Sequence, residues 1–232
     1  MLIVFGSIAM TITMGVDTLP DINERITASD FSVTPGGKGA NQALAAARAG
    51  AGKVAIIGKI SDDEFSSHIL TKIRRDGVMT SGVGQSDLPT ATHVIVQDSR
   101  GRSMEIVNPG ANVETTHEQV PDDILNEKAL VLVQTELAEA ENDELLARAK
   151  QGGTKTVMNL SPSIKMSKRM LKNIDYLIVN HDEAKKLAVQ MGMKMEVNAM
   201  KIAEGLAQLG GLYCIITLGE RGAVAVTPDR VG

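Results

Sequence analysis

Short apolar runs alternate with amphipathic stretches along most of this chain. Leu2-Ile3-Val4-Phe5 is apolar at every position, which is typical of a strand covered on both faces. Similar runs occur at residues 54–57, 129–133, 156–158, 176–179 and 214–216. Helical patterns lie between several of them, at residues 64–76, 141–151, 181–191 and 198–210. This alternation predicts an α/β fold around a mostly parallel sheet.

Two segments lack intervening helices. Residues 11–33 and 91–107 have the pattern of short alternating strands, and the second contains a turn at Asp98-Ser99-Arg100-Gly101. We interpret them as a small β-lid over one end of the main sheet.

A glycine-rich stretch joins one of these strands to a helix. Phe31-Ser32-Val33 alternates like a short strand, which we expect Pro35 to end because proline removes a ladder donor. Two glycines follow, and strong helix formers then run up to Gly50. Asn41 and Gln42 should therefore lie in the first helical turn, where unpaired amides and the helix dipole favour an anionic or hydroxyl-rich ligand. The alternative is a simple cap whose alanines pack closely on a sheet.

Composition narrows the class of partner. The formal charge of −4, the pI of about 5.6 and the aromatic content of 2% argue against binding to nucleic acid. No apolar run approaches the ~20 residues of a membrane span, and the N-terminus lacks the basic flank of a signal peptide. We therefore expect no membrane association, a small-molecule ligand and a cytoplasmic location. Cys214 lies in an apolar run and is predicted to belong to the core.

Polar residues follow the predicted strands where ligands of open α/β sheets bind, beyond the carboxyl ends. Asn180 and Glu183 are spaced for a capping box at a helix start, or for a binding site. Residues 217–222 form a glycine turn after a strand, or a ligand loop. Glu136, taken by itself, is a solvated acid near a helix start, where the helix dipole favours it.

The run Gly36-Gly37-Lys38-Gly39-Ala40-Asn41-Gln42-Ala43 resembles the sugar-binding motif of the ribokinase-like (phosphofructokinase-B-type) carbohydrate kinases. The similarity is collinear from Gly6 to Gly222. It implies a single α/β domain over residues 1–232, built as a three-layer sandwich with a mostly parallel central sheet and a β-lid formed by about 11–33 and 91–107. It also implies transfer of a phosphoryl group from ATP to the primary hydroxyl of a sugar, with a pentose such as ribose as the expected substrate.

The resemblance also assigns roles to residues. It implies sugar contacts from Gly37, Lys38, Gly39, Ala40, Asn41, Thr11 and Glu136. It implies nucleotide contacts from Asn180, Thr217, Leu218, Gly219, Glu220, Arg221 and Gly222. Glu183 would serve Mg²⁺, K⁺ is a second cation that the family suggests, and the lid would form a homodimer interface.

This chain departs from the family pattern in two places. Ala9 and Thr11 stand where the family has an Asn and an Asp that bind sugar hydroxyls, and a lost buried acceptor costs about 1–3 kcal/mol. The second family motif, Asp-Thr-x-Gly-Ala-Gly-Asp, would lie beyond Gly232, so no catalytic residue is assigned and we expect this 232-residue chain to be a truncated, inactive kinase. The alternative is a non-catalytic sugar- or nucleotide-binding protein derived from the kinase fold.

Overall fold

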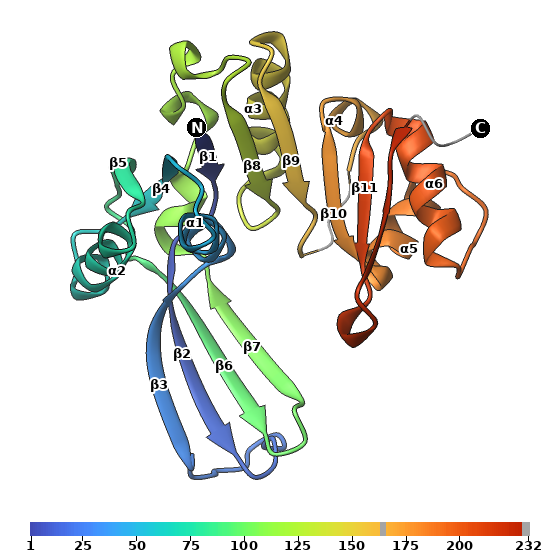
Figure 1. Cartoon of the computed structure of the whole chain (residues 1–232). Helices are drawn as coiled ribbons and strands as arrows, with labels where there is room; N and C mark the ends of the chain where they lie inside the picture. The colour runs from blue at the N-terminus through green and yellow to red at the C-terminus, as the bar shows by residue number, and fades with distance from the viewer. Residues whose placement is uncertain (163–165, 229–232) are drawn as a thin grey trace. The chain divides into compact units, whose positions relative to one another are not determined.

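The computed structural model describes residues 1–162 and 166–228 (Figure 1). The chain divides into two compact units. Unit 1 consists of Met1–Phe5 and Thr116–Gly232, and unit 2 consists of Gly6–Thr115.

Unit 1 contains a mostly parallel sheet with the strand order β12-β11-β10-β9-β8-β1. Its parallel strands are β1 (Leu2–Phe5), β8 (Leu130–Gln134), β9 (Lys155–Asn159), β10 (Tyr176–Asn180) and β11 (Tyr213–Thr217). The strand β12 (Ala223–Val226) runs antiparallel to β11. The connecting helices are α3 (Glu139–Gln151), α4 (Lys168–Lys172), α5 (His181–Gln190) and α6 (Ala199–Gly210).

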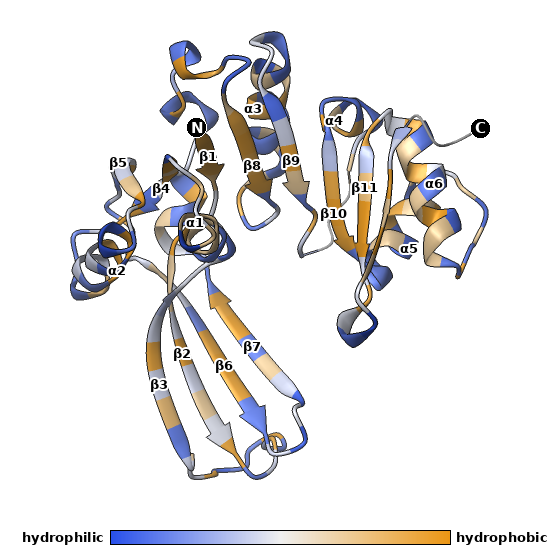
Figure 2. Cartoon of the chain, viewed as in Figure 1, coloured by the Kyte–Doolittle hydropathy of each residue, from blue (hydrophilic) through white to orange (hydrophobic). Residues whose placement is uncertain are grey.

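The central strands of unit 1 are buried because their side chains are apolar. Ile3, Val4 and Phe5 are 0% exposed, and β1 and β8 are mostly orange in Figure 2. Cys214 is also fully buried, as predicted. These strands and helices confirm the predicted α/β fold class with a mostly parallel sheet.

Unit 2 begins its own α/β part with α1 (Lys38–Arg48), β4 (Val54–Ile60), α2 (Glu64–Arg75) and β5 (Met79–Gln85). The strands β4 and β5 pair in parallel. The sequence did not predict β5, because two glycines weaken its strand pattern. At Gly82 the end of the Ile57 side chain fills the space beside the backbone, because a Cβ at this position would lie 2.1 Å from it.

The second sheet of unit 2 has the order β3-β2-β6-β7. Its strands are β2 (Ala9–Val16), β3 (Asp30–Gly36), β6 (Ala91–Asp98) and β7 (Ser103–Asn108). The prediction that Pro35 ends its strand was wrong, because β3 continues to Gly36 and Pro35 lies opposite Met10. An edge strand tolerates proline, since its outer side needs no ladder donor.

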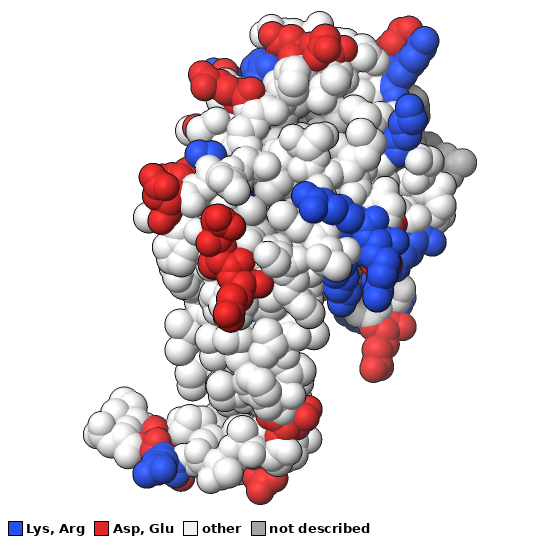
Figure 3. Space-filling view, turned by 90° about the vertical axis from the view of Figure 1, so that its left-hand side faces the viewer, with Lys and Arg blue, Asp and Glu red and all other residues white. Residues whose placement is uncertain are grey.

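One face of this second sheet is apolar across all four strands. Strand registers align Val33, Ile12, Val94 and Ile106 in one row and Phe31, Met14, Val96 and Met104 in the next. Alternation along each strand places both rows on one face. Phe31 is 60% and Ile106 is 62% exposed. On the side shown in Figure 3, the second sheet at the bottom of the view is largely uncharged along its strands, with charged groups near its far end.

The helices of the described residues are short. The longest, α3, has 13 residues, and none of them is long and apolar enough to cross a membrane.

Candidate functional site

The glycine motif packs against the chain's own backbone. Gly37 is the N-cap of α1 with φ of 86°, a conformation that favours glycine. A Cβ on Gly37 would lie 2.7 Å from the Ser7 carbonyl oxygen, and one on Gly39 would lie 2.5 Å from the Gly6 carbonyl carbon. The glycines therefore allow the start of α1 to approach the segment that precedes β2.

The amides of this helix start are already paired. Gly39 N–H donates to Ser7 Oγ at 3.3 Å, Ala40 N–H donates to the Ser7 carbonyl at 3.0 Å, and Asn41 N–H donates to the Gly37 carbonyl at 2.9 Å. The expectation of unpaired first-turn amides was wrong for these three residues. A ligand would instead meet side chains, since Asn41 is exposed and Lys38 is half-buried.

Thr11 lies beside this motif within unit 2. It is half-buried in β2. Its Oγ1 fills the space beside Gly36, because a Cβ added to Gly36 would lie 2.1 Å from this oxygen. Ala9, at the start of the same strand, is fully buried. The structure therefore brings Thr11 to the glycine motif, whereas Glu136 belongs to unit 1.

Polar residues end four adjacent parallel strands of unit 1. Gln134 is aligned with Asn159, and Asn180 is aligned with Thr217. Glu136 follows β8 by two residues and is half-buried in a turn. This edge gathers the predicted Glu136, Asn180 and Thr217 onto the carboxyl ends of one sheet, where ligands of α/β proteins bind.

Asn180 and Glu183 form the predicted capping box of α5. Asn180 Oδ1 accepts from Glu183 N–H at 2.8 Å, and Glu183 Oε2 accepts from Asn180 N–H at 2.8 Å. Glu183 is only 8% exposed. Within the described part of the chain, no group of three His, Cys, Asp or Glu side chains is arranged to hold a metal ion.

The loop after β11 is an exposed glycine turn. Leu218 N–H donates to the Gly222 carbonyl at 2.8 Å, which closes the loop. Gly219 and Gly222 have φ of 63° and 87°. Thr217, Glu220 and Arg221 are exposed. The loop therefore has an exposed guanidinium group, and Thr217, which precedes it, is aligned with Asn180 on the neighbouring strand.

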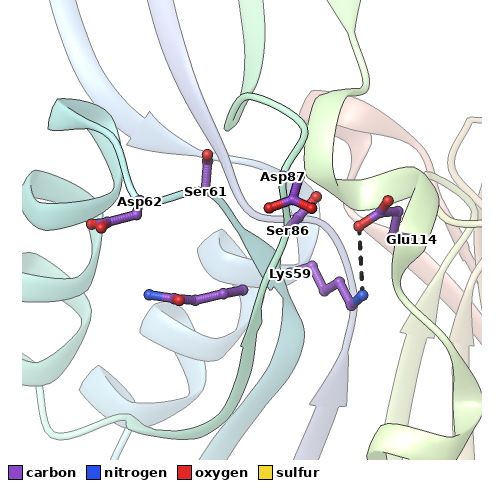
Figure 4. Close-up of a pocket in the computed structure, with 7 residues that line it drawn as sticks. Lys59, Ser61, Asp62, Ser86, Asp87 and Glu114 are labelled. Carbon is purple, nitrogen blue, oxygen red and sulfur yellow. Dashed lines mark ion pairs between the residues drawn. The ribbon is translucent and has the colours of Figure 1, made fainter.

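A polar cavity in unit 2 was not anticipated from the sequence (Figure 4). Its volume is about 430 Å³, and most of its lining residues follow the carboxyl ends of β4 and β5. The lining residues are Lys59, Ser61, Asp62, Gln85, Ser86, Asp87 and Glu114. Lys59 Nζ reaches Glu114 Oε2 at 3.5 Å. Recognising β5 would have pointed to this edge.

Two residues that support the glycine motif were also not assigned from the sequence. Ser7 is fully buried and accepts a hydrogen bond from Gly39 N–H in the first turn of α1. Asn112 Oδ1 accepts a hydrogen bond from Ile8 N–H at 3.1 Å. Such partners follow from tertiary proximity and carry no local signal.

Comparison with known proteins identifies the family. The model of the pfkB family of carbohydrate kinases matches residues 1–232. The chain belongs to this family. This match confirms the resemblance seen in the glycine motif. The ribokinases among its relatives support the description of the chain as a ribokinase-like sugar kinase.

Among those relatives, a ribokinase from Lactococcus lactis subsp. lactis is 30% identical over 224 residues, which cover 95% of this chain and 71% of the relative. A ribokinase from Mus musculus is 26% identical and is covered to 70% of its length. The structure of ribokinase from Thermotoga maritima matches this chain with a TM-score of 0.87 and 28% sequence identity. The match covers 99% of this chain and 75% of the Thermotoga chain. Arabidopsis thaliana ribokinase, solved in complex with ribose and ATP, matches 99% of this chain and 75% of its own with a TM-score of 0.83 and 26% identity.

Proposed function

We propose that this protein transfers the γ-phosphoryl group of ATP to the primary hydroxyl of a sugar, with a pentose such as ribose as the acceptor. One observation carries the proposal: the ribokinase solved with ribose and ATP matches 99% of this chain with a TM-score of 0.83. The proposed reaction needs ATP, so we keep the cytoplasm as the expected compartment.

The proposed sugar contacts come from side chains at the glycine motif. The backbone N–H groups of Gly39, Ala40 and Asn41 already donate to partners within the chain. The hydrogen bonds to sugar hydroxyls would therefore come from the side chains of Lys38 and Asn41. Gly37, Gly39 and Ala40 form the close-packed backbone below them. Thr11 and Glu136 supply further oxygen atoms for hydroxyl groups.

The proposed nucleotide contacts come from the carboxyl edge of unit 1. Asn180 and Thr217 are aligned on neighbouring strands, and Leu218, Gly219, Glu220 and Gly222 complete the exposed turn. The Arg221 guanidinium is suited to phosphate oxygens, which it can bind with two hydrogen bonds.

Glu183 suits Mg²⁺ only as an indirect partner. One of its oxygens already accepts from Asn180 N–H, and the side chain is 8% exposed. Mg²⁺ keeps several waters when it binds to proteins, so Glu183 would hold a water of the ion. When bound with ATP, the ion neutralises charge on the phosphate groups. K⁺ stays a prediction of the family resemblance, with no residue assigned.

The alternative is a sugar- or nucleotide-binding protein without transferase activity. It is favoured by Ala9 and Thr11, which stand where the family has polar residues. Because the Asp-Thr-x-Gly-Ala-Gly-Asp motif does not occur within these 232 residues, we predict that the 232-residue chain, tested by itself, binds ligands without turnover.

Two measurements separate these functions. Calorimetry with D-ribose and with Mg-ATP tests binding by the 232-residue chain, and a coupled assay tests ADP release over a sugar panel by the protein as its own cell makes it. Sugar-dependent ADP release supports the kinase. Binding without ADP release supports the alternative, and the absence of both overturns both.

A further inference from the structure

Asn112 is a buried polar residue in η1 (Gly110–Glu114), the short helix that follows β7. Its Oδ1 accepts from the backbone N–H of Ile8 at 3.1 Å, although the two residues are 104 positions apart. Ile8 is fully buried and lies between β1 and β2, outside any strand ladder. Asn112 therefore provides the acceptor that this buried N–H requires.

Ile8 lies at the point that supports the glycine motif. Its neighbour Ser7 accepts hydrogen bonds from Gly39 and Ala40 in the first turn of α1. Its other neighbour, Ala9, begins β2 opposite Gly36. A change in the backbone at Ile8 would therefore move both contacts of the motif together.

The helix η1 is itself held on its other sides. Ala111 N–H donates to the Pro89 carbonyl at 2.8 Å, just before β6. Gly110 packs so closely on Pro89 that a Cβ would lie 2.2 Å from that carbonyl oxygen. Glu114 is paired with Lys59 at 3.5 Å across the cavity of Figure 4. Asn112 thus extends from a fixed support to the segment that carries the motif.

We propose that Asn112 is a positioning residue that sets the geometry of the glycine motif and thereby the affinity of unit 2 for its ligand. It acts through Ile8 and Ser7, without touching the ligand. The nature of that ligand, a sugar, rests on the proposed function above.

Hydrogen exchange of the 232-residue chain tests the positioning step without any ligand. Asn112→Leu removes the acceptor at similar volume, and Asn112→Ala removes it without added bulk should the Leu variant fail to fold. We expect the Gly39 and Ala40 amides to exchange about tenfold faster in these variants, with α2 amides unchanged. Asn112→Asp keeps an acceptor oxygen and should restore slow exchange.

Lys59→Met is the matched control, because it removes a different anchor of η1 and leaves the Asn112 bond in place. It should leave the Gly39 and Ala40 amides as in the wild type. The proposal is overturned if Asn112→Leu and Asn112→Ala leave these amides unchanged, or if Lys59→Met accelerates them equally. A general loss of stability would instead accelerate exchange throughout unit 2, which would also count against a positioning role.

Calorimetry then tests the consequence for binding. Asn112→Leu should weaken D-ribose binding about tenfold, Asn112→Asp should restore it, and Mg-ATP affinity should stay unchanged, because the proposed nucleotide residues belong to unit 1. If the wild type binds no ribose, the proposed sugar is wrong, while the exchange experiment still decides the role of Asn112. Ribose binding that is equal in wild type and Asn112→Leu would overturn the effect on affinity.

Discussion

Gly37 and Gly39 show how single residues determine the approach of one segment to another. The start of α1 lies so close to Gly6 and Ser7 that side chains at these positions have no space. Ser7 uses this closeness to accept two hydrogen bonds from the helix. The glycines therefore serve the packing of the motif first, and any ligand meets the side chains around them.

We predict that Gly39→Ala destabilises the fold by about 2 kcal/mol, because its Cβ would lie 2.5 Å from the Gly6 carbonyl carbon and 2.7 Å from the Ser7 nitrogen, which are both backbone atoms. Urea unfolding measures the change. Gly52→Ala is the control, since a Cβ there meets nothing within 4 Å. Equal stability of the two variants would contradict this account of the motif.

We predict that the Cys214 thiol is unreactive in the folded protein. Burial raises its pKa to about 12, so almost no thiolate is present at about pH 8. Labelling with a disulfide reagent should be slow in buffer and fast in denaturant. Rapid labelling of the native chain would contradict the burial of this strand.

At the scale of elements, Asp63 joins α2 to the start of the second sheet. Its Oδ1 accepts from Ser66 N–H at 2.9 Å, which caps α2, and its Oδ2 accepts from Thr90 N–H at 2.9 Å, just before β6. Burial alone would raise the pKa of Asp63, but the hydrogen bonds from Thr90 and Ser66 hold it below its usual value.

This lowered pKa predicts a pH dependence. A carboxyl group with a lower pKa in the folded state stabilises the fold above its unfolded pKa, near 3.8, and loses this contribution as the pH falls through its folded pKa. Asp63→Asn should therefore be less stable than the wild type at about pH 7, and this difference should shrink below about pH 4. Urea unfolding at several pH values measures it, with the exposed neighbour Asp62→Asn as the control. A difference that does not change with pH would contradict the role of the charge.

At the scale of the whole molecule, the second sheet presents an apolar face that its own unit leaves partly exposed. Phe31 and Ile106 are 60% and 62% exposed on this face. Contiguous exposed apolar surface of this kind marks interaction sites. It supports the proposal, made from the family resemblance, that two copies associate through this sheet.

We predict that the chain is a dimer in solution and that Ile106→Glu makes it monomeric, because a buried unpaired charge opposes association. Sedimentation measures the mass of each form. Ser103→Glu adds the same charge to β7 on the opposite face and should remain dimeric. A monomeric wild type, or loss of the dimer in the control alone, would contradict an interface on the apolar face.

The sequence predicted the central strands of unit 1 and the helices α2, α3, α5 and α6 because their hydrophobic patterns are local and strong. The capping box of Asn180 and Glu183 was also predictable, since both partners lie within one turn. The sequence did not predict β5, because its glycines carry no side-chain pattern. It also did not predict that β3 continues through Pro35.

By itself, the sequence determined the fold class, the family and the positions of polar residues after the strands, because each depends on neighbouring residues or on motif spacing. Only the tertiary structure decided which atoms meet. It paired the amides of α1 with Ser7, joined Asn112 to Ile8 and aligned the apolar rows of the second sheet. These contacts join residues distant in the chain, and no local pattern records them.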